Sequence, residues 1–85
     1  MSAIDELLMR LRRFASGEAH LLTDANAIEA ACDELSEEHP VLEDLALEFA
    51  AYRPEGGEYL YDFAQMKPRV EGCIRVLEQA RRAEP

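Results

Sequence analysis

Apolar residues recur at intervals of three and four positions along most of the chain, which is the spacing of an amphipathic α-helix. The pattern predicts a first helix over residues 3–15, with Ser2 and Asp5 spaced as a capping box at its start. A second helix is predicted from Thr23 or Asp24 to about residue 38. Its buried stripe is expected to contain Ala27, Ile28, Ala31, Cys32 and Leu35.

The second half of the chain predicts two further helices separated by a loop. Pro40 suits the first position of a third helix that ends before Pro54, because the missing N–H costs nothing there. Residues 53–58 hold a proline and two glycines and are expected to form an exposed loop, followed by a short extended stretch over 59–61. Asp62 can cap a single turn from residue 63. The main fourth helix is expected from about Pro68 to about residue 82, because a proline further inside would clash with the carbonyl four residues back.

The third and fourth predicted helices each have an apolar face. The third helix is expected to bury Leu42, Leu45, Phe49 and Tyr52. The fourth is expected to bury Val70, Ile74, Leu77 and Ala80. Amphipathic helices joined by short links predict an all-α fold, a small antiparallel four-helix bundle with an acidic loop between the third and fourth helices. A chain of 85 residues has room for one domain, 1–85.

The charge is unevenly distributed along the chain, whose net charge is -9. Residues 1–13 hold three arginines against two acids (+1), residues 14–66 hold thirteen acids against Arg53 alone (-12), and residues 67–85 hold five bases against three acids (+2). The acidic middle disfavours nucleic acid and anionic membranes as direct partners and favours a cationic protein. With no apolar run of bilayer length, and with acids where a signal peptide carries bases, the protein is expected to be cytoplasmic.

The acids of the second and third predicted helices repeat at helical spacing. Glu29, Asp33 and Glu37 follow at intervals of four, and Glu34/Glu38 and Asp44/Glu48 are further pairs with the same spacing. Like charges four residues apart destabilise a helix, and no base between residues 14 and 52 relieves the repulsion. Two interpretations stay open: a surface that binds a cationic partner, and a generic solvated acidic face.

Signals for catalysis or metal binding are weak. Cys32 and Cys73 lie among apolar residues and are expected to be buried free thiols. His20 and His39 lie in different segments, without a nucleophile motif near either. The Gly56–Gly57 pair lacks the spacing and the following lysine of a phosphate-binding loop. The chain is therefore not expected to be an enzyme or to hold a cofactor or a metal ion.

The predicted loop combines carboxylates with aromatic rings. Glu55, Glu58 and Asp62 alternate with Tyr59 and Tyr61 around the glycine pair. Tyrosine is enriched at interface hot spots, and carboxylates pair with the lysine and arginine of a nuclease groove. In the alternative interpretation, one of the two rings folds back over the end of the bundle.

The C-terminal half of the chain also resembles a known family. The run from Leu45 to Glu55, the acidic glycine-containing loop, Tyr61, Asp62 and the closing helix from Val70 to Leu77 resemble the colicin D immunity proteins and their bacterial self-protective relatives. The sequence departs from that pattern in its Gly56–Gly57 pair and in the placement of Pro68.

The resemblance implies a compact four-helix immunity protein. Such a protein would bind one-to-one in the basic active-site cleft of a cognate tRNA-cleaving bacteriocin or contact-dependent toxin, with carboxylates in place of tRNA phosphates. The residues expected to contact the toxin, including one added from the acidic helix face, are Asp44, Glu48, Glu55, Glu58, Tyr59, Tyr61 and Asp62. The alternatives are a non-enzymatic adaptor that docks on a basic host protein or self-associates through apolar residues such as Val41 and Val76, and an accessory subunit of an enzyme.

Overall fold

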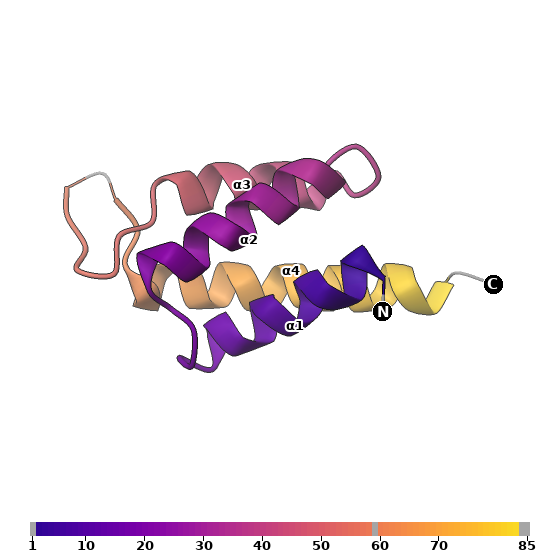
Figure 1. The fold of residues 1–85 in the computed structure, drawn as a ribbon, viewed down its shortest axis with the longest axis horizontal. Coiled ribbons are helices and arrows are strands. Elements are labelled where there is room, and N and C mark those ends of the chain that lie inside the picture. Colours follow the sequence, from indigo (N-terminus) through magenta and orange to yellow (C-terminus); the bar gives the residue numbers. More distant parts are fainter. Residues whose placement is uncertain (1, 59, 84–85) are drawn as a thin grey trace.

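The chain folds into helices in a computed structural model that describes residues 2–58 and 60–83. The helices are α1 (Ala3–Ala15), α2 (Leu22–Leu35), α3 (Val41–Ala50) and α4 (Phe63–Ala83) (Figure 1). Within the described residues there is no strand, only an isolated bridge between Tyr52 and Tyr61. The all-helical class predicted from the periodicity is confirmed. None of the helices so described combines the length and the apolar character needed to cross a bilayer.

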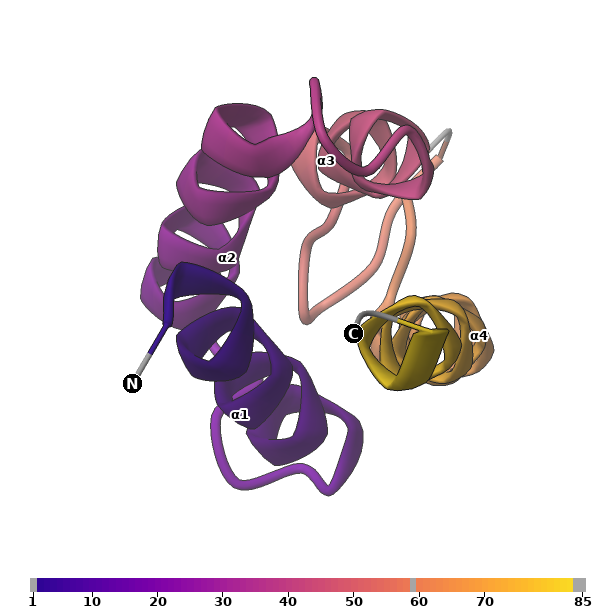
Figure 2. The ribbon, with the colours of Figure 1, turned by 90° about the vertical axis from the view of Figure 1, so that its right-hand side faces the viewer.

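Each helix packs against two others. α2 packs most extensively on α3 and α1 on α4, while smaller contacts join α1 to α2 and α3 to α4. The links between successive helices lie at alternating ends of the molecule (Figure 1). Seen from one end, α3 lies at the top and α1 and α4 lie below it (Figure 2). The molecule measures 43 × 23 × 19 Å.

The core is built from the apolar stripes of all four helices. Phe14 lies at its centre, with ring centroids 5.1 Å from Phe49, 5.2 Å from Tyr52 and 5.5 Å from Phe63. These edge-on and tilted contacts join α1 to the end of α3 and the start of α4. The buried apolar residues are Leu7, Leu8, Leu11, Phe14, Ala25, Ile28, Cys32, Leu42, Leu45, Ala46, Phe49, Tyr52, Met66, Val70, Cys73 and Leu77.

Two ends of the molecule are fixed by side-chain hydrogen bonds. At the start of α1, the Ser2 hydroxyl accepts from the Asp5 N–H at 3.2 Å while the Asp5 carboxylate accepts from the Ser2 N–H at 3.4 Å, which confirms the predicted capping box. Between α1 and α2, the buried Tyr52 hydroxyl donates to the His20 carbonyl at 2.5 Å. His20 is half-buried, and its ring lies 5.5 Å from that of Phe63 between centroids.

The bounds and the buried face of α2 differ from the prediction. The helix begins at Leu22, where the Asp24 carboxylate accepts from the Leu21 N–H at 3.2 Å, and it ends at Leu35, three residues earlier than predicted. Near its end, the Ser36 hydroxyl donates to the Asp33 carbonyl at 2.9 Å, which offers that carbonyl a partner outside the helical ladder. The packed face of α2 is set by Ala25, Ile28 and Cys32, at intervals of three and four, and Ala27 lies outside it and is exposed, so the prediction of a buried Ala27 is wrong.

The predicted break before Pro68 is also wrong, because α4 runs without interruption from Phe63 to Ala83. Pro68 lies in the second turn on the exposed side, where its ring meets solvent rather than a neighbouring helix. The next residue, Arg69, donates from its Nη1 to the Gln65 carbonyl at 2.7 Å. A side chain thus adds a donor beside the position where a proline removes one from the backbone.

Candidate protein-binding surface

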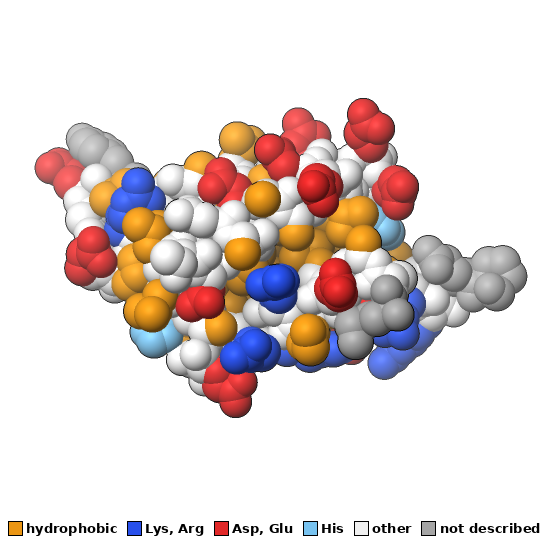
Figure 3. Space-filling view, in the orientation of Figure 1, with side chains coloured by type: hydrophobic (Ala, Val, Ile, Leu, Met, Phe, Trp, Pro, Cys, Tyr) orange, Lys and Arg blue, Asp and Glu red, His pale blue; other side chains and the backbone are white. Residues whose placement is uncertain are grey.

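The fold separates the charges of the chain into two sides. α1 carries three arginines against two acids and α4 five bases against two acids, so these packed helices together carry +1 + 3 = +4. α2 carries four acids, residues 36–40 two and α3 three, without a base, which gives -4 - 2 - 3 = -9. We call α2, residues 36–40 and α3 the acidic side, and α1 with α4 the basic side. In Figure 3, many of the acidic side chains gather along the upper edge.

Most carboxylates of the acidic side point into solvent. Glu43 and Asp44 on α3 are exposed, as are Asp33 and Glu34 at the end of α2. None of these four has an ion-pair partner within residues 2–58 and 60–83. α2 ends at Leu35, so Glu37 and Glu38 lie beyond it. Of the predicted like-charge pairs, only Glu29/Asp33 and Asp44/Glu48 therefore keep the helical spacing at which they repel.

Glu48 has a different environment from the other predicted contact residues. It is half-buried and forms an ion pair with Arg69 of α4. The guanidinium of Arg69 also lies over the Tyr61 ring, 4.5 Å from its centroid. The expectation that no base relieves the charge of this segment therefore fails at Glu48, because the base comes from a distant part of the chain.

Tyr61 and Asp62 are tied into the fold, whereas Glu55 and Glu58 are exposed in the loop. The Tyr61 N–H donates to the Ala51 carbonyl at 3.0 Å, and its carbonyl accepts from the Arg53 N–H at 2.9 Å, which closes the loop at its base. The Tyr61 ring is half-buried against the core, so for this residue the interpretation of a ring folded back holds. Tyr59 lies outside the described residues.

Asp62 caps α4, as its position in the sequence suggested. Its Oδ1 accepts from the Gln65 N–H at 2.9 Å, and the Gln65 side chain accepts in return from the Asp62 N–H at 3.0 Å. This is a capping box, and replacement of the aspartate by alanine removes a helix cap as well as a charge.

Leu47 is a surface residue that the sequence reasoning missed. Its side chain is 69% exposed, the most of any large apolar side chain in the described part of the chain. It follows Glu43 and Asp44 by one turn of α3 and therefore lies on the same face. Its position in the sequence could have predicted this exposure, because Leu47 falls outside the stripe formed by Leu42, Leu45 and Phe49.

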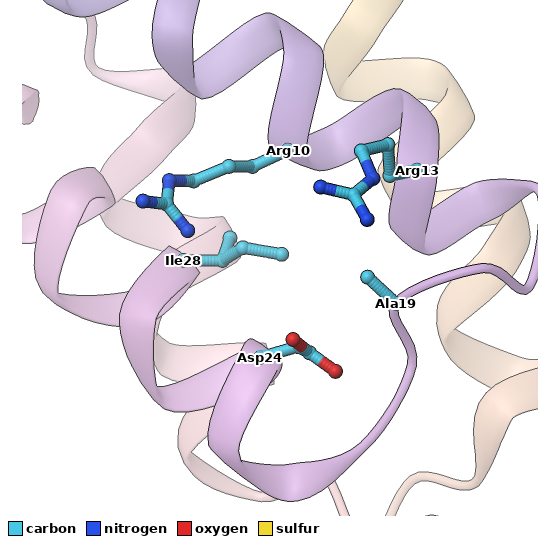
Figure 4. A pocket seen from close by; sticks show the side chains of 5 residues that line it. All are labelled: Arg10, Arg13, Ala19, Asp24 and Ile28. Carbon is cyan, nitrogen blue, oxygen red and sulfur yellow. The ribbon is translucent and has the colours of Figure 1, made fainter.

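The hollows of the surface are small or shallow. One cavity of about 30 Å³ lies between α1 and α2, lined by Arg10, Arg13, Ala19, Asp24 and Ile28 (Figure 4). It has room for a water molecule rather than a substrate. A more open hollow of about 250 Å³ is lined by Glu78, Arg81 and Arg82. The residues described here include no group of three or more histidine, cysteine or acidic side chains placed to hold a metal ion.

Comparisons with family models, curated proteins and solved structures find no match to this chain. The resemblance to the colicin D immunity proteins therefore stays a prediction from residues 45–77.

The described surface presents exposed carboxylates and apolar side chains to other molecules. The two thiols are buried, as predicted, and burial raises the pKa of Cys32 to about 12 and that of Cys73 to about 11. Both are therefore protonated and poor nucleophiles near neutral pH. Exposed carboxylates without internal partners are instead suited to pairing with lysine and arginine of another molecule.

Proposed function

We propose that the protein is an immunity protein that binds and inhibits the cationic nuclease domain of a cognate tRNA-cleaving bacteriocin or contact-dependent toxin. The observation that carries the proposal is the acidic side, which bears nine acids and no base on one side of a small molecule. A groove that binds tRNA phosphates must be cationic, so this side and the groove are complementary in charge. In this proposal the helices form an antiparallel bundle that holds the acidic side and the acidic loop as one rigid surface.

The inhibitor would act by occupying the groove. Carboxylates such as Asp44, Glu55 and Glu58 would take the positions of tRNA phosphates, one inhibitor for each nuclease domain. Electrostatic attraction between the two surfaces would speed association and make it sensitive to salt. The half-buried Glu48, already paired with Arg69, would contribute less than the fully exposed acids.

The proposal predicts that a neighbouring gene encodes the nuclease domain, and the test is binding and inhibition of that domain. Calorimetry at about 0.05 and 0.5 M salt should give a one-to-one complex that weakens at the higher salt, where screening shortens the range of the attraction. The complex should also stop cleavage of tRNA by the domain. The variant Glu55→Ala/Glu58→Ala/Asp62→Asn removes three charges while the asparagine keeps the helix cap, and it should weaken binding about tenfold or more.

Arg75→Ala/Arg82→Ala on the basic side is the matched control and should bind as the unchanged protein does. Binding that ignores both salt and the loop carboxylates would refute the proposed mechanism. Tight, salt-sensitive binding to a basic protein without nuclease activity would instead identify the chain as an acidic adaptor.

A further inference from the structure

Exposed apolar side chains lie on both charged sides of the molecule. Leu47 is 69% exposed on α3, within the acidic side. Met9, 45% exposed on α1, and Val76, 46% exposed on α4, lie within the basic side. We call the exposed face of α3 formed by Glu43, Asp44 and Leu47 the Leu47 face. No helix in the described part of the chain covers it.

We propose that the Leu47 face docks on the basic side of a second copy of this chain. The Leu47 face offers a leucine beside two carboxylates that lack an ion-pair partner among the described residues. The basic side offers the opposite combination, since the exposed Arg10 is adjacent to Met9 on α1 and has no ion-pair partner within the described residues, unlike Arg12 and Arg13, which pair with Glu78 and Glu18. Burial of the apolar side chains and pairing of the charges then favour the same contact.

A second set of exposed cations on the basic side lies on α4. Arg75 is adjacent to Val76, and Arg82 lies two turns further along the same helix. Both are exposed, and neither has an ion-pair partner within the described ranges, unlike Arg81, which pairs with Asp5 at 2.7 Å. The basic side therefore keeps cations that are available to carboxylates of another molecule.

The net charge of -9 makes two copies repel each other, and the salt concentration sets the distance over which this repulsion acts. At physiological ionic strength the screening length is about 8 Å, shorter than the 19 and 23 Å across the molecule. The acidic sides of two copies stacked in this way are then screened from one another, while the docked surfaces remain in contact. At about 0.01 M salt the screening length is about 30 Å and repulsion between whole molecules dominates. Association should therefore strengthen from low to physiological salt.

The contact would join different surfaces of the two copies. α3 packs on α4, and it lies above both α1 and α4 in Figure 2. Each docked pair would leave one Leu47 face and one basic side free, so further copies could add in the same way. The average mass should keep rising with concentration instead of stopping at a dimer.

Sedimentation velocity of the full chain tests the proposal, over roughly 10 µM to 1 mM, the range in which contacts of micromolar to millimolar dissociation constant become populated. One variant, Glu43→Lys/Asp44→Lys, reverses the charge of the Leu47 face, and a second, Arg75→Glu/Arg82→Glu, places acids beside Val76 and lowers the charge of the basic side from +4 to +4 - 4 = 0. Each alone should be a monomer. Mixed, they should associate, because the basic side of the first variant and the Leu47 face of the second are both intact, and the two altered surfaces do not repel each other.

Leu47→Ser should weaken self-association of the unchanged protein about tenfold. Ala30→Ser, at an exposed position of α2, is its matched control and should leave association unchanged. Circular dichroism melts establish that each variant is folded before it is scored. A protein that stays monomeric throughout this range at physiological salt, or variants that still assemble alone, would overturn the proposal. Neither result bears on the nuclease complex, which is measured with its partner and scored by inhibition.

Discussion

Cys32 and Cys73 show how the fold changes the chemistry of single residues. Both thiols are buried, and burial is the main reason that the pKa of Cys32 rises to about 12 and that of Cys73 to about 11. In an unfolded chain a thiol titrates near pH 8.5. Above that pH the unfolded chain has lost protons that the folded protein retains, so stability falls as pH rises.

We expect the free energy of unfolding to fall between about pH 8.5 and about 11 by about 1.4 kcal/mol per pH unit for each thiol. Urea unfolding at a series of pH values measures the slope, and Cys32→Ala/Cys73→Ala should lose this part of it. The native protein should also fail to react with a thiol reagent at pH 8 while the urea-unfolded chain reacts. Equal slopes for the two proteins, or rapid labelling of the native one, would contradict the expectation.

At the scale of the element, α4 tolerates two residues that disfavour helices. Pro68 lies on its exposed side and Gly72 is half-buried one turn later. The proline removes a backbone donor, and the glycine has more conformational freedom to lose on folding. The Asp62–Gln65 capping box and the buried stripe of the helix stabilise it against these costs.

Pro68→Ala should raise the free energy of unfolding by about 1–3 kcal/mol, because alanine restores the missing donor and prefers the helix. Gly72→Ala is the reference substitution and should raise the free energy of unfolding by about 1 kcal/mol. The added Cβ fits, because its nearest atom is Arg75 Nη2 at 3.8 Å. Chemical unfolding of both variants measures the difference. A less stable Pro68→Ala variant would mean that the ring makes a contact the helix needs.

For the whole molecule, the separation of charge is the main property that folding creates. The acidic side gathers nine acids without a base, while the basic side is bound together by ion pairs such as Arg12–Glu78 at 2.8 Å and Arg81–Asp5 at 2.7 Å. These pairs are partly exposed, and such pairs contribute little to stability. Repulsion within the acidic side should therefore outweigh them in the free protein.

Raising sodium chloride from about 0.05 to 0.5 M should increase the free energy of unfolding by about 0.5–1 kcal/mol, because salt screens this repulsion. Thermal or urea unfolding at several salt concentrations, with protein dilute enough to be monomeric, measures the effect. Asp33→Asn/Glu34→Gln removes two of the crowded charges and should reduce the gain. A protein that loses stability in salt would show instead that the ion pairs of the basic side dominate.

The sequence by itself determined the local structure. Apolar spacing predicted the extent of α1 and the buried face of α3, because a helix places residues three and four apart on one side. The capping box at Ser2 and the cap at Asp62 were visible for the same reason, since their partners are three residues away, whereas the reciprocal bond from Gln65 was not predicted. The bounds of α2 and the continuity of α4 through Pro68 were predicted wrongly. At both places local propensity competes with packing along the whole helix.

Tertiary structure alone decided which distant charges share a surface. Packing of α1 on α4 and of α2 on α3 turned a charge pattern along the chain into an acidic side and a basic side. It also gave Glu48 a cation from α4 and left Leu47 exposed, neither of which follows from spacing within α3. The physical reason is that helical periodicity assigns residues to faces, whereas only the packing of helices determines what each face meets.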